Sequence, residues 1–461
     1  MLAAVGMGAA KQELYRQAIG GSAVMRRSAG DIARLDPIRA VERLGEATSF
    51  LFQRFDPVTR RLRRTVAGLE VGIIGADEDF AAALRRGEPR AGPDRATSPC
   101  LVFAGFETLV GRKAVGAALP GHLILRVVEG FDIDHRMGAL RLISQDPATL
   151  DVKLAALGAV GDNEGMGRGA SGAASRAHAA APVDGWSADM DAAGHALRVD
   201  AVKEAVASGM VEGAVLSVGL SRPTAASPFA LYRAFAAANP SPYGFVLNHG
   251  GAALVGSSPL AFLNLTGRRL HLETDAGTRP VTGDVARDAA AAEDLRENPK
   301  DAAEHRVVVE AEREALATIA RNGRVDRVVD REVRRFSHVM HLYSALEADL
   351  SEGCDLADAI LALAPAAAVS GWPKRAAAQL GYELEGASRG PYGGIVGLVE
   401  PGRADLAVVI RSLWLADGRA SLRVGGKIVA GSSAGDEYRE ALAKARFLVE
   451  GVAHAERDAS G

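Results

Sequence analysis

Residues 425–440 read GGKIVAGSSAGDEYRE, a glycine-rich segment that runs directly into an acidic one. A second acidic segment, NPKDAAEH, occupies residues 298–305. Each acidic segment holds two carboxylates at i, i+3 spacing: Glu437 with Glu440, and Asp301 with Glu304. On a helix this spacing puts both carboxylates on one face, one turn apart. Two such faces brought together would form an oxygen-rich site for a hard divalent cation.

Glycine and proline recur in three segments around these acidic pairs. Closely spaced glycines and prolines predict tight turns and close approach of the backbone to a neighbour. Charge pairs at i, i+3 spacing also occur on ordinary solvated helix faces. Acidic pairs beside several tight turns favour a substrate cradle instead. The segments are SGWPK at 370–374, RGPYGG at 389–394 and GGKIVAGS at 425–432.

The composition excludes several classes of function. The chain has 461 residues, of which 48% are hydrophobic, enough for a large core in two domains or one composite. Its 54 basic and 57 acidic residues are well mixed, so no basic run is available to follow nucleic acid. The chain contains no stretch of about twenty uncharged apolar residues, which a membrane-spanning helix would require. We therefore expect neither nucleic acid nor a membrane as a partner.

Cysteine usage bears on the compartment. Cys100 and Cys354 are too few for a disulfide framework, and they lack the spacing of a C-x-x-C metal site. The first residues mix apolar side chains with several cationic ones and show no sustained apolar run before a cleavage site. These features fit a reducing compartment, and we expect the protein to be cytoplasmic.

The composition shifts once along the chain. Residues 161–185 are rich in Gly, Ala and Ser and hold few large apolar side chains, which predicts a linker or long loop. We therefore expect an N-terminal α/β subdomain over 1–160 and a larger catalytic-type domain over 186–455. In the first part, short apolar runs between turn signals predict strands, and residues 77–88 predict a helix. The predicted strands cover residues 69–76, 98–106 and 121–131.

Helical and extended patterns are mixed in the second part. Helical spacing of apolar residues predicts a long helix over about 303–323, ending at an Asn-Gly stop. Shorter helices are predicted at 199–210, 228–239 and about 436–450. The predicted strands lie at 213–221, 243–250, 252–258, 261–274, 404–417 and 420–432.

The order of these segments resembles the chorismate-utilising enzymes, and anthranilate synthase component I most closely. Nine motifs occur in the family's order between about residues 202 and 450, whereas the first 160 residues match only in general character. The resemblance implies an α+β fold in which two facing, mainly antiparallel β-sheets are flanked by helices. The motifs are NPSPYGFVL, LVGSSP, AGTRPVTGD, KDAAEH, RNGRV, SGWPK, ELEGASRGPYGGIVG, VIRS and GGKIVAGSSAGDEYRE.

The resemblance assigns the acidic pairs to a magnesium site. It implies Glu304, Glu437 and Glu440 as the metal ligands, with Asp301 behind them. The chemistry of the residues agrees, because Mg²⁺ takes octahedral oxygen ligands, keeps several waters and needs only a few carboxylates.

The resemblance also implies a set of substrate-binding residues. Arg411, inside the otherwise apolar run AVVIRSLWL, would hold the enolpyruvyl carboxylate of chorismate, and Tyr392 would add a hydroxyl. Buried arginine is costly unless it meets an anion, and its planar fork suits a carboxylate; an edge-strand arginine in a structural ion pair is the alternative. The remaining predicted binding residues are Ala276, Gly277, Thr278, Gly425, Gly426 and Lys444.

Two residues are candidates for proton transfer. His341 matches a family histidine beside the substrate ring, and a neutral imidazole suits proton transfer near neutral pH. Lys427 stands where the family has a small residue of the glycine loop, so a cation has entered the predicted cradle. Ala276 stands where aminodeoxychorismate synthases carry a nucleophilic lysine, which argues against that reaction.

Other departures from the family's pattern affect acid and base groups. The glutamate that follows LVGSSP and protonates the departing ring hydroxyl is replaced by Leu260. The strand position that holds a water-activating lysine in isochorismate and salicylate synthases is Gly213. Glu212 would replace it only if a bulge shifted the register. A threonine expected before SGWPK is Ala368.

These observations favour Mg²⁺-dependent conversion of chorismate, or of a close analogue, by a lyase of anthranilate synthase component I type. Ammonia would add to the ring, the ring hydroxyl would leave, and pyruvate would be eliminated. Glutamine-dependent activity would require a separate glutamine amidotransferase subunit. Two alternatives stay open: isochorismate or salicylate synthesis with water as the nucleophile, and a non-catalytic chorismate-binding paralogue.

Overall fold

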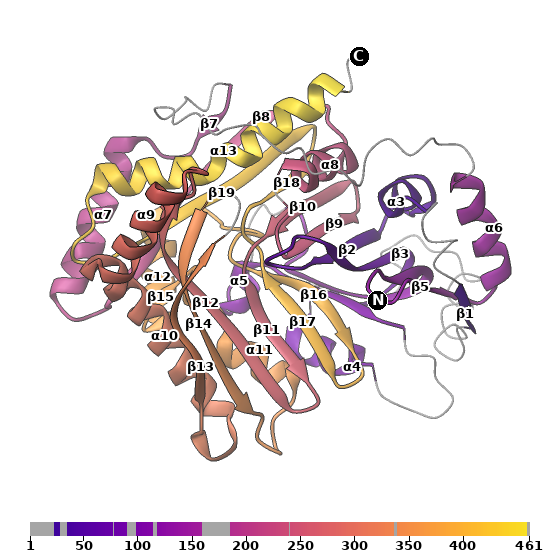
Figure 1. Cartoon of the computed structure of the whole chain (residues 1–461), viewed down its shortest axis with the longest axis horizontal. Coiled ribbons are helices and arrows are strands. Elements are labelled where there is room, and N and C mark those ends of the chain that lie inside the picture. The colour runs from indigo at the N-terminus through magenta and orange to yellow at the C-terminus, as the bar shows by residue number, and fades with distance from the viewer. Residues whose placement is uncertain are drawn as a thin grey trace.

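The computed structural model describes residues 23–27, 35–76, 78–89, 98–113, 118–158, 185–238, 240–335 and 339–458. The predicted linker at 161–185 lies almost wholly outside these residues, so the predicted domain boundaries stay predictions. Within the described ranges, the chain forms nineteen strands whose pairings are all antiparallel, together with helices on their outer faces (Figure 1). None of the helices in these ranges is long and apolar enough to cross a membrane.

The strands form two arms that share β5 (His122–Asp134). In hydrogen-bonded order, the first arm continues from β5 through β3 (Leu62–Gly75), β2 (Ser49–Phe55), β9 (Tyr243–His249), β10 (Ala252–Ser258), β18 (Ser412–Ala416) and β19 (Arg419–Ile428) to β8 (Gly213–Pro223). The second arm continues from β5 through β4 (Cys100–Ala104), β16 (Ile395–Glu400), β17 (Arg403–Val408), β11 (Ala261–Thr266), β12 (Arg269–Pro280) and β14 (Val339–Asp349) to β13 (Asp326–Arg335).

Short strands complete the network. On β5, β6 (Ala139–Ser144) and then β1 (Ala23–Arg27) extend the sheet. On the free edge of β8, β7 (Ser187–Ala188) and β15 (Gly371–Trp372) add one strand each. The β2–β9 and β4–β16 pairings join strands that lie before and after the predicted linker, so the two predicted parts of the chain share their sheets.

An apolar core lies between the two arms. It takes Phe50 from β2 and Leu254 from β10 in the first arm, and Val396 from β16 and Ala407 from β17 in the second. Alternate residues of a strand point to opposite faces, so a core drawn from both arms requires that one face of each arm meet the other. The prediction of an α+β fold with two facing, mainly antiparallel sheets is therefore confirmed, with β5 as the strand that the sheets share.

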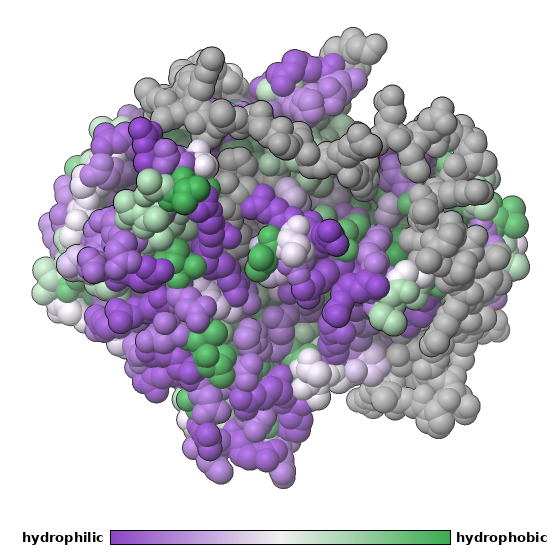
Figure 2. Space-filling view, viewed as in Figure 1, coloured by the Kyte–Doolittle hydropathy of each residue, from purple (hydrophilic) through white to green (hydrophobic). Residues whose placement is uncertain are grey.

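Helices cover the outer face of each arm. The first arm packs against α3 (Pro37–Leu44), α6 (Pro147–Gly158), α8 (Pro228–Ala238) and α13 (Ala434–Asp458), and the second against α4 (Phe80–Gly87), α10 (Pro299–Ile319) and α11 (Leu356–Leu363). Near β8 and β19, α7 (Ala192–Ala207) and α12 (Lys374–Glu385) enclose a smaller core. The remaining helical elements are α5 (Phe106–Leu109), α9 (Val285–Glu297) and η2 (Arg321–Gly323). On the face drawn in Figure 2, hydrophobic residues form small patches among hydrophilic ones.

Most predicted elements are present, with several differences. The run at 404–417 is two strands, because β17 ends at Val408 and β18 begins at Ser412. The run at 261–274 is likewise two strands, because β11 ends at Thr266 and β12 begins at Arg269. The predicted last helix is longer than 436–450, since α13 spans Ala434–Asp458. Sequence patterns also failed to indicate β13, whose side chains are largely exposed and charged and so lack apolar alternation.

A buried ion pair fixes the loop that follows α12. Arg389 has 0% exposed surface and donates from Nη2 and Nε to Glu385 at 2.6 and 2.9 Å. It also donates to the carbonyl oxygens of Val215 on β8 and Val369, at 2.8 and 2.7 Å. One guanidinium thereby holds together β8, the segment before SGWPK and the loop that carries Tyr392.

We expect Arg389→Met to lower the free energy of unfolding by about 3–5 kcal/mol, because it leaves the Glu385 carboxylate buried without its cation. Urea denaturation would measure the change. The matched control is Arg446→Met, which removes an exposed i, i+4 pair with Glu450 and should cost less than about 1 kcal/mol. A loss below about 1 kcal/mol for Arg389→Met would show that the pair does not fix this loop.

Candidate active site

One cavity of about 290 Å³ is lined by every residue that the sequence singled out for a site. It lies among α10, α13, β12, β14 and β19, with the loops before β11 and β18 and the loop after α12. The structure thus brings together residues up to 168 positions apart; their individual roles stay predictions. The residues are Ala276, Gly277, Thr278, Asp301, Glu304, His341, Tyr392, Arg411, Gly425, Gly426, Lys427, Glu437, Glu440 and Lys444.

The acidic pairs face the cavity from two different helices. Asp301 and Glu304 lie in the first turns of α10, where Asn298 caps the helix, and Glu437 and Glu440 lie at the start of α13. Burial and the nearby carboxylates of Glu437 and Glu440 raise the pKa of Glu304 to about 7. Burial is the larger of these causes, so the raised pKa marks Glu304 as a carboxyl in a poorly solvated site beside other carboxylates.

Lysine ammonium groups meet this cluster. Lys300 Nζ lies 3.1 Å from Glu437 Oε1 and 3.4 Å from Glu304 Oε1, so one cation bridges the two helices. Lys444 Nζ lies 2.8 Å from Glu440 Oε1. Asp301 is held apart from the cluster, because its Oδ2 accepts from Arg279 Nη2 at 2.6 Å.

The carboxylates fit a divalent cation in chemistry, although they are not gathered around one point. Over the described residues, no three acidic, histidine or cysteine side chains are arranged as a ready metal site. The Lys300 ammonium stands between Glu304 and Glu437 where a bridging cation would lie. Glu304 and Glu437 are hard oxygen donors that could hold Mg²⁺ in place of the Lys300 ammonium, with Glu440 beside them.

The cavity also holds a buried cation. Burial lowers the pKa of Arg411, and the nearby Asp275 only partly offsets this effect. Among the described residues, no carboxylate lies within ion-pair distance of its guanidinium. Arg411 is not inside a strand as predicted: it sits between β17 and β18 with φ 49°, a conformation that only a few per cent of non-glycine residues adopt. The turn aims the guanidinium into the cavity rather than into the sheet.

Tyr392 and His341 also line the cavity. Burial raises the pKa of Tyr392 to about 12, so its hydroxyl stays protonated and can donate. Burial and the charge of Arg411 lower the pKa of His341 to about 4, which leaves a neutral imidazole. Its Nδ1 lies 3.0 Å from Gly277 O and, since a carbonyl can only accept, Nδ1 carries the proton while Nε2 carries the lone pair of the imidazole.

Two glycine positions allow backbone to border the cavity. Gly277 has φ 74° at a bulge of β12, and a Cβ there would meet Asp301 Oδ1 at 3.0 Å. A Cβ on Gly425 would lie 2.4 Å from Leu216 O, closer than real Cβ atoms approach. Lys444 donates to Gly425 O at 3.0 Å, and so connects α13 to this part of β19.

Lys427 projects from β19 beside the position of the missing strand lysine. A Cβ added to Gly213 would lie 3.7 Å from Lys427 Cγ, and Gly213 itself does not line the cavity. Lys427 Nζ is buried without a hydrogen-bond partner, and burial lowers its pKa to about 8. Glu212 offers no substitute, because it pairs with Arg306 at 2.9 Å, and the β8–β19 register shows no bulge.

Sequence reasoning missed several titratable residues of the cavity, among them Lys300 and Asp275. Asp275 precedes Ala276 on β12 and lines the cavity together with Leu260. The sequence signal for Asp275 was an acidic residue in the run LETDAGT, at the end of a predicted strand, because acidic residues are rarely buried in strands. Ala368, the other departure from the family's pattern, lines the same cavity.

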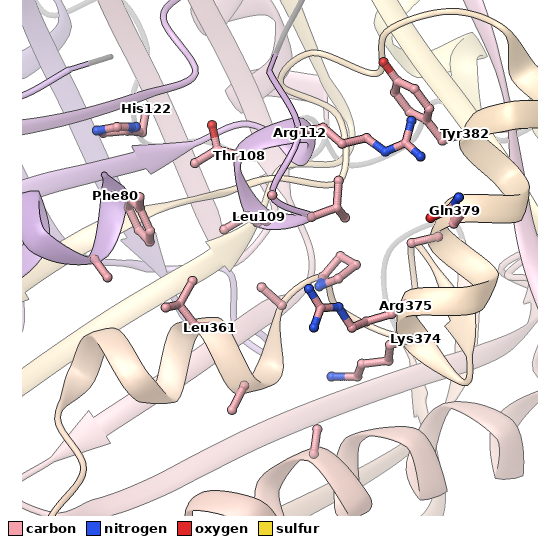
Figure 3. A pocket seen from close by; sticks show the side chains of 18 of the residues that line it. Phe80, Thr108, Leu109, Arg112, His122, Leu361, Lys374, Arg375, Gln379 and Tyr382 are labelled. Carbon is pink, nitrogen blue, oxygen red and sulfur yellow. The ribbon is translucent and has the colours of Figure 1, made fainter. Parts of the chain in front are cut away.

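A second cavity of about 1400 Å³ lies between α4 and α5 on one side and α10, α11 and α12 on the other. Figure 3 shows Phe80, Leu109 and Leu361 toward one side and Arg112, Arg375 and Tyr382 toward the other. It is the larger of the two, yet none of the residues with perturbed carboxyl or imidazole pKa values lines it. The smaller cavity is therefore the candidate active site.

Known proteins resemble this chain in sequence and in fold. Residues 104–450 match the sequence model of a family described as chorismate binding enzyme. Anthranilate synthase component 1 of Streptomyces coelicolor is 40% identical over 286 residues, which cover 60% of this chain and 56% of that protein. The counterpart in Thermus thermophilus is 39% identical over 262 residues, 56% of this chain and 57% of that protein. The chain thus matches these curated relatives over about half of their length.

Two solved structures share the fold. Anthranilate synthase component I of Streptococcus pneumoniae superimposes with a TM-score of 0.67 at 24% identity, covering 92% of this chain and 99% of that one. The menaquinone-specific isochorismate synthase of Escherichia coli superimposes with a TM-score of 0.73 at 21% identity, covering 96% and 98%. At these identities the likeness extends to the fold alone.

Proposed function

Because the chain belongs to the chorismate binding enzyme family, we propose that it converts chorismate with Mg²⁺ by a reaction of anthranilate synthase component I type. Ammonia adds to the ring carbon next to the carboxylate-bearing carbon, the ring hydroxyl leaves, and pyruvate is eliminated. The roughly 40% identity to proteins named anthranilate synthase component 1 supports this choice within the family.

The observation that carries the proposal is one cavity that is lined by both an arginine and a carboxylate cluster. Arg411 offers a guanidinium that forms no ion pair among the described residues. Glu304 and Glu437 form a carboxylate cluster that the Lys300 ammonium bridges. A dicarboxylate matches this pattern, because one carboxylate can pair with Arg411 while a cation joins the other to the glutamates.

The metal, when bound at Glu304, Glu437 and Glu440, would neutralise one substrate carboxylate and stabilise negative charge on it. Arg411 would hold the enolpyruvyl carboxylate in a bidentate contact, with the Tyr392 hydroxyl donating to the same group. Backbone at Gly277, Gly425 and Gly426 would border the ring carboxylate. His341 Nε2 and the Lys427 amine are candidate proton acceptors in the cavity, and Lys427, with a pKa of about 8, is a stronger base than His341, whose pKa is lowered to about 4.

Glutamine would have to be hydrolysed on another chain. Cys100 is buried, donates to Gly87 O at 3.3 Å, and has a pKa raised by burial, so it is not an activated nucleophile. Cys354 lies outside the cavity. We therefore propose that a separate glutamine amidotransferase subunit supplies ammonia, and that free ammonium replaces it in vitro.

Isochorismate or salicylate synthesis is the second candidate, and the position of Lys427 favours it. The lysine side chain passes within about 4 Å of the space that a side chain at position 213 would fill. A lysine amine in this space can activate water as well as deprotonate ammonium. The two candidates therefore differ in the nucleophile rather than in the site.

Chromatography of the products tests the proposal. Purified protein is incubated with chorismate and Mg²⁺, with and without ammonium, and each mixture is repeated with a chelator. We expect an aromatic amine only when ammonium and Mg²⁺ are both present. A hydroxylated product without ammonium would replace the proposed function by the second candidate. Chorismate binding without any product would identify the protein as a non-catalytic paralogue.

Lys427→Met is expected to lower kcat for the ammonium reaction by about 10- to 100-fold, because a positioned base is lost while the stem volume is kept. Initial rates at saturating chorismate would measure the effect. Lys203→Met is a matched control, since Lys203 donates to Ser432 O at 3.2 Å outside the cavity. Equal rates for Lys427→Met and the native protein would exclude Lys427 from the reaction.

A further inference from the structure

The cavity contains a carboxyl group to which none of the roles above has been given. Asp275 lies on β12, lines the cavity, and has a buried Oδ1 without a hydrogen-bond partner. Within the described residues it forms no ion pair. A buried carboxyl oxygen without a partner is costly, so such a group in a protein calls for an explanation.

Asp275 lies in the same cavity as the position of the missing acid. In the β11–β12 hairpin, Asn264 pairs with His271 and Thr266 with Arg269, and β12 continues past this pairing to Asp275. Leu260 directly precedes β11, and both Leu260 and Asp275 line the cavity. A carboxyl therefore lines the cavity in which the resemblance leads us to expect a glutamate at position 260.

The surroundings of Asp275 keep its proton in place. Glu273 lies two residues from Asp275 on β12. Tyr343 on β14 and Arg334 on β13 lie on one side of Asp275, and the charge of Arg411 also acts on it. Arg334 is already used, because it pairs with Glu273 at 3.2 Å and stacks on the Tyr343 ring at 3.3 Å. Burial and the charge of Glu273 raise the pKa of Asp275 to about 7.

The neighbouring leucine contributes to this state. Leu260 is 5% exposed, and its apolar side chain helps to exclude water from this end of the cavity. Lower solvation disfavours the carboxylate more than the neutral acid. Leu260, where a glutamate was expected, thus helps to keep the Asp275 carboxyl neutral.

We propose that Asp275 is the general acid that protonates the ring hydroxyl as it departs. This inference rests on the proposed function. As the bond between nitrogen and ring carbon forms, the two ring double bonds shift and the bond between ring carbon and hydroxyl oxygen breaks. That oxygen takes the proton of Asp275 and leaves as water, and Asp275 becomes a carboxylate. The added nitrogen then releases one proton to the Lys427 amine, and Asp275 regains a proton from solvent; no oxidant or reductant is needed.

Asp275→Asn tests the assignment. We expect kcat to fall at least about 10²-fold, the usual lower range for a positioned acid, while the Kd for chorismate measured by calorimetry changes less than about threefold. In the native protein the rate should fall as pH rises through about 7, because only the protonated acid donates. This fall in rate above pH 7, the basic limb of the pH profile, should be absent from the variant. Asp349→Asn, at an exposed end of β14, makes the same chemical change outside the cavity and should keep both rate and pH profile.

A second variant returns the acid to position 260. Leu260→Glu in the Asp275→Asn background should recover at least tenfold of the lost kcat, because the two positions line the same cavity. Native-like kcat and an unchanged basic limb in Asp275→Asn would overturn the inference while leaving the proposed function intact. Native protein without activity on chorismate would overturn both. Loss of chorismate binding together with kcat would assign Asp275 to binding instead and would also overturn it.

Discussion

Glu437→Gln is expected to reduce kcat for chorismate at least about 10³-fold and to abolish the dependence of the rate on Mg²⁺. Glu437 is 3% exposed and lies at the start of α13, where its Oε1 meets the Lys300 ammonium at 3.1 Å. The neutral amide keeps the size of the side chain but removes the charge that attracts a hard cation. A metal that stabilises charge in a transition state contributes several kcal/mol, and each 1.36 kcal/mol is a factor of ten.

Calorimetric titration with Mg²⁺ separates this effect from a catalytic one. Native protein in the presence of chorismate should bind Mg²⁺, and Glu437→Gln should bind it at least about tenfold more weakly. Glu450→Gln is the control, because Glu450 lies on the same helix and makes only an exposed pair with Arg446. Unchanged Mg²⁺ affinity and rate in Glu437→Gln would show that the acidic pairs are structural.

Arg411→Met is expected to lower kcat/KM for chorismate by about 10²- to 10³-fold, from the 2–5 kcal/mol that a buried charge pair typically loses on truncation. The guanidinium faces the cavity in a left-handed turn, and no described carboxylate within ion-pair distance competes for it. The substrate carboxylate would therefore be its partner. Most of the loss should appear as weaker chorismate binding.

The stability of Arg411→Met distinguishes this role from a structural one. Burial lowers the pKa of Arg411, so the charged group costs the empty protein free energy, and the variant should unfold at the same or a higher temperature than the native protein. Arg419→Met, at the exposed start of β19, serves as the control with unchanged kinetics. A destabilised variant that binds chorismate normally would identify Arg411 as a structural residue.

The acidic pairs could be predicted from sequence because their geometry is local. The i, i+3 spacing fixes how each pair lies on its own helix, and both predicted helices are present, although α10 begins at Pro299 and α13 extends to Asp458. That the two helices meet at Lys300 depends on how the second arm packs against α10 and on how α13 lies across β19. The order of the nine motifs predicted that the two helices meet, whereas the periodicity of apolar residues could not predict it.

The errors have local physical causes. Apolar residues continue through the turn at Arg411, so the sequence pattern did not show that the strand is interrupted there by a residue with φ 49°. Asp275 was overlooked because the sequence does not show that it lines the same cavity as Leu260. Likewise, the nearness of Lys427 to Gly213 results from pairing between β19 and β8, which are more than 200 residues apart in the chain.

Arg411 and the acidic pairs occupy positions that the resemblance implies for binding. The acid and the base that we propose lie at other positions than those that it implies: Asp275 instead of position 260, and Lys427 instead of position 213. Lys427 pairs across the sheet with Val215, and its Cγ would lie 3.7 Å from a Cβ on Gly213.

Incorporation of labelled nitrogen tests the central claim most directly. Purified protein is incubated with chorismate, Mg²⁺ and ¹⁵N-ammonium in ¹⁸O-water. The products are then separated, and their masses are measured by mass spectrometry. The account predicts an aromatic product with one ¹⁵N atom and no ¹⁸O on the ring, and its formation at a rate that Asp275→Asn and Glu437→Gln both lower. Unchanged chorismate, or a ring that carries ¹⁸O instead of ¹⁵N, would contradict it.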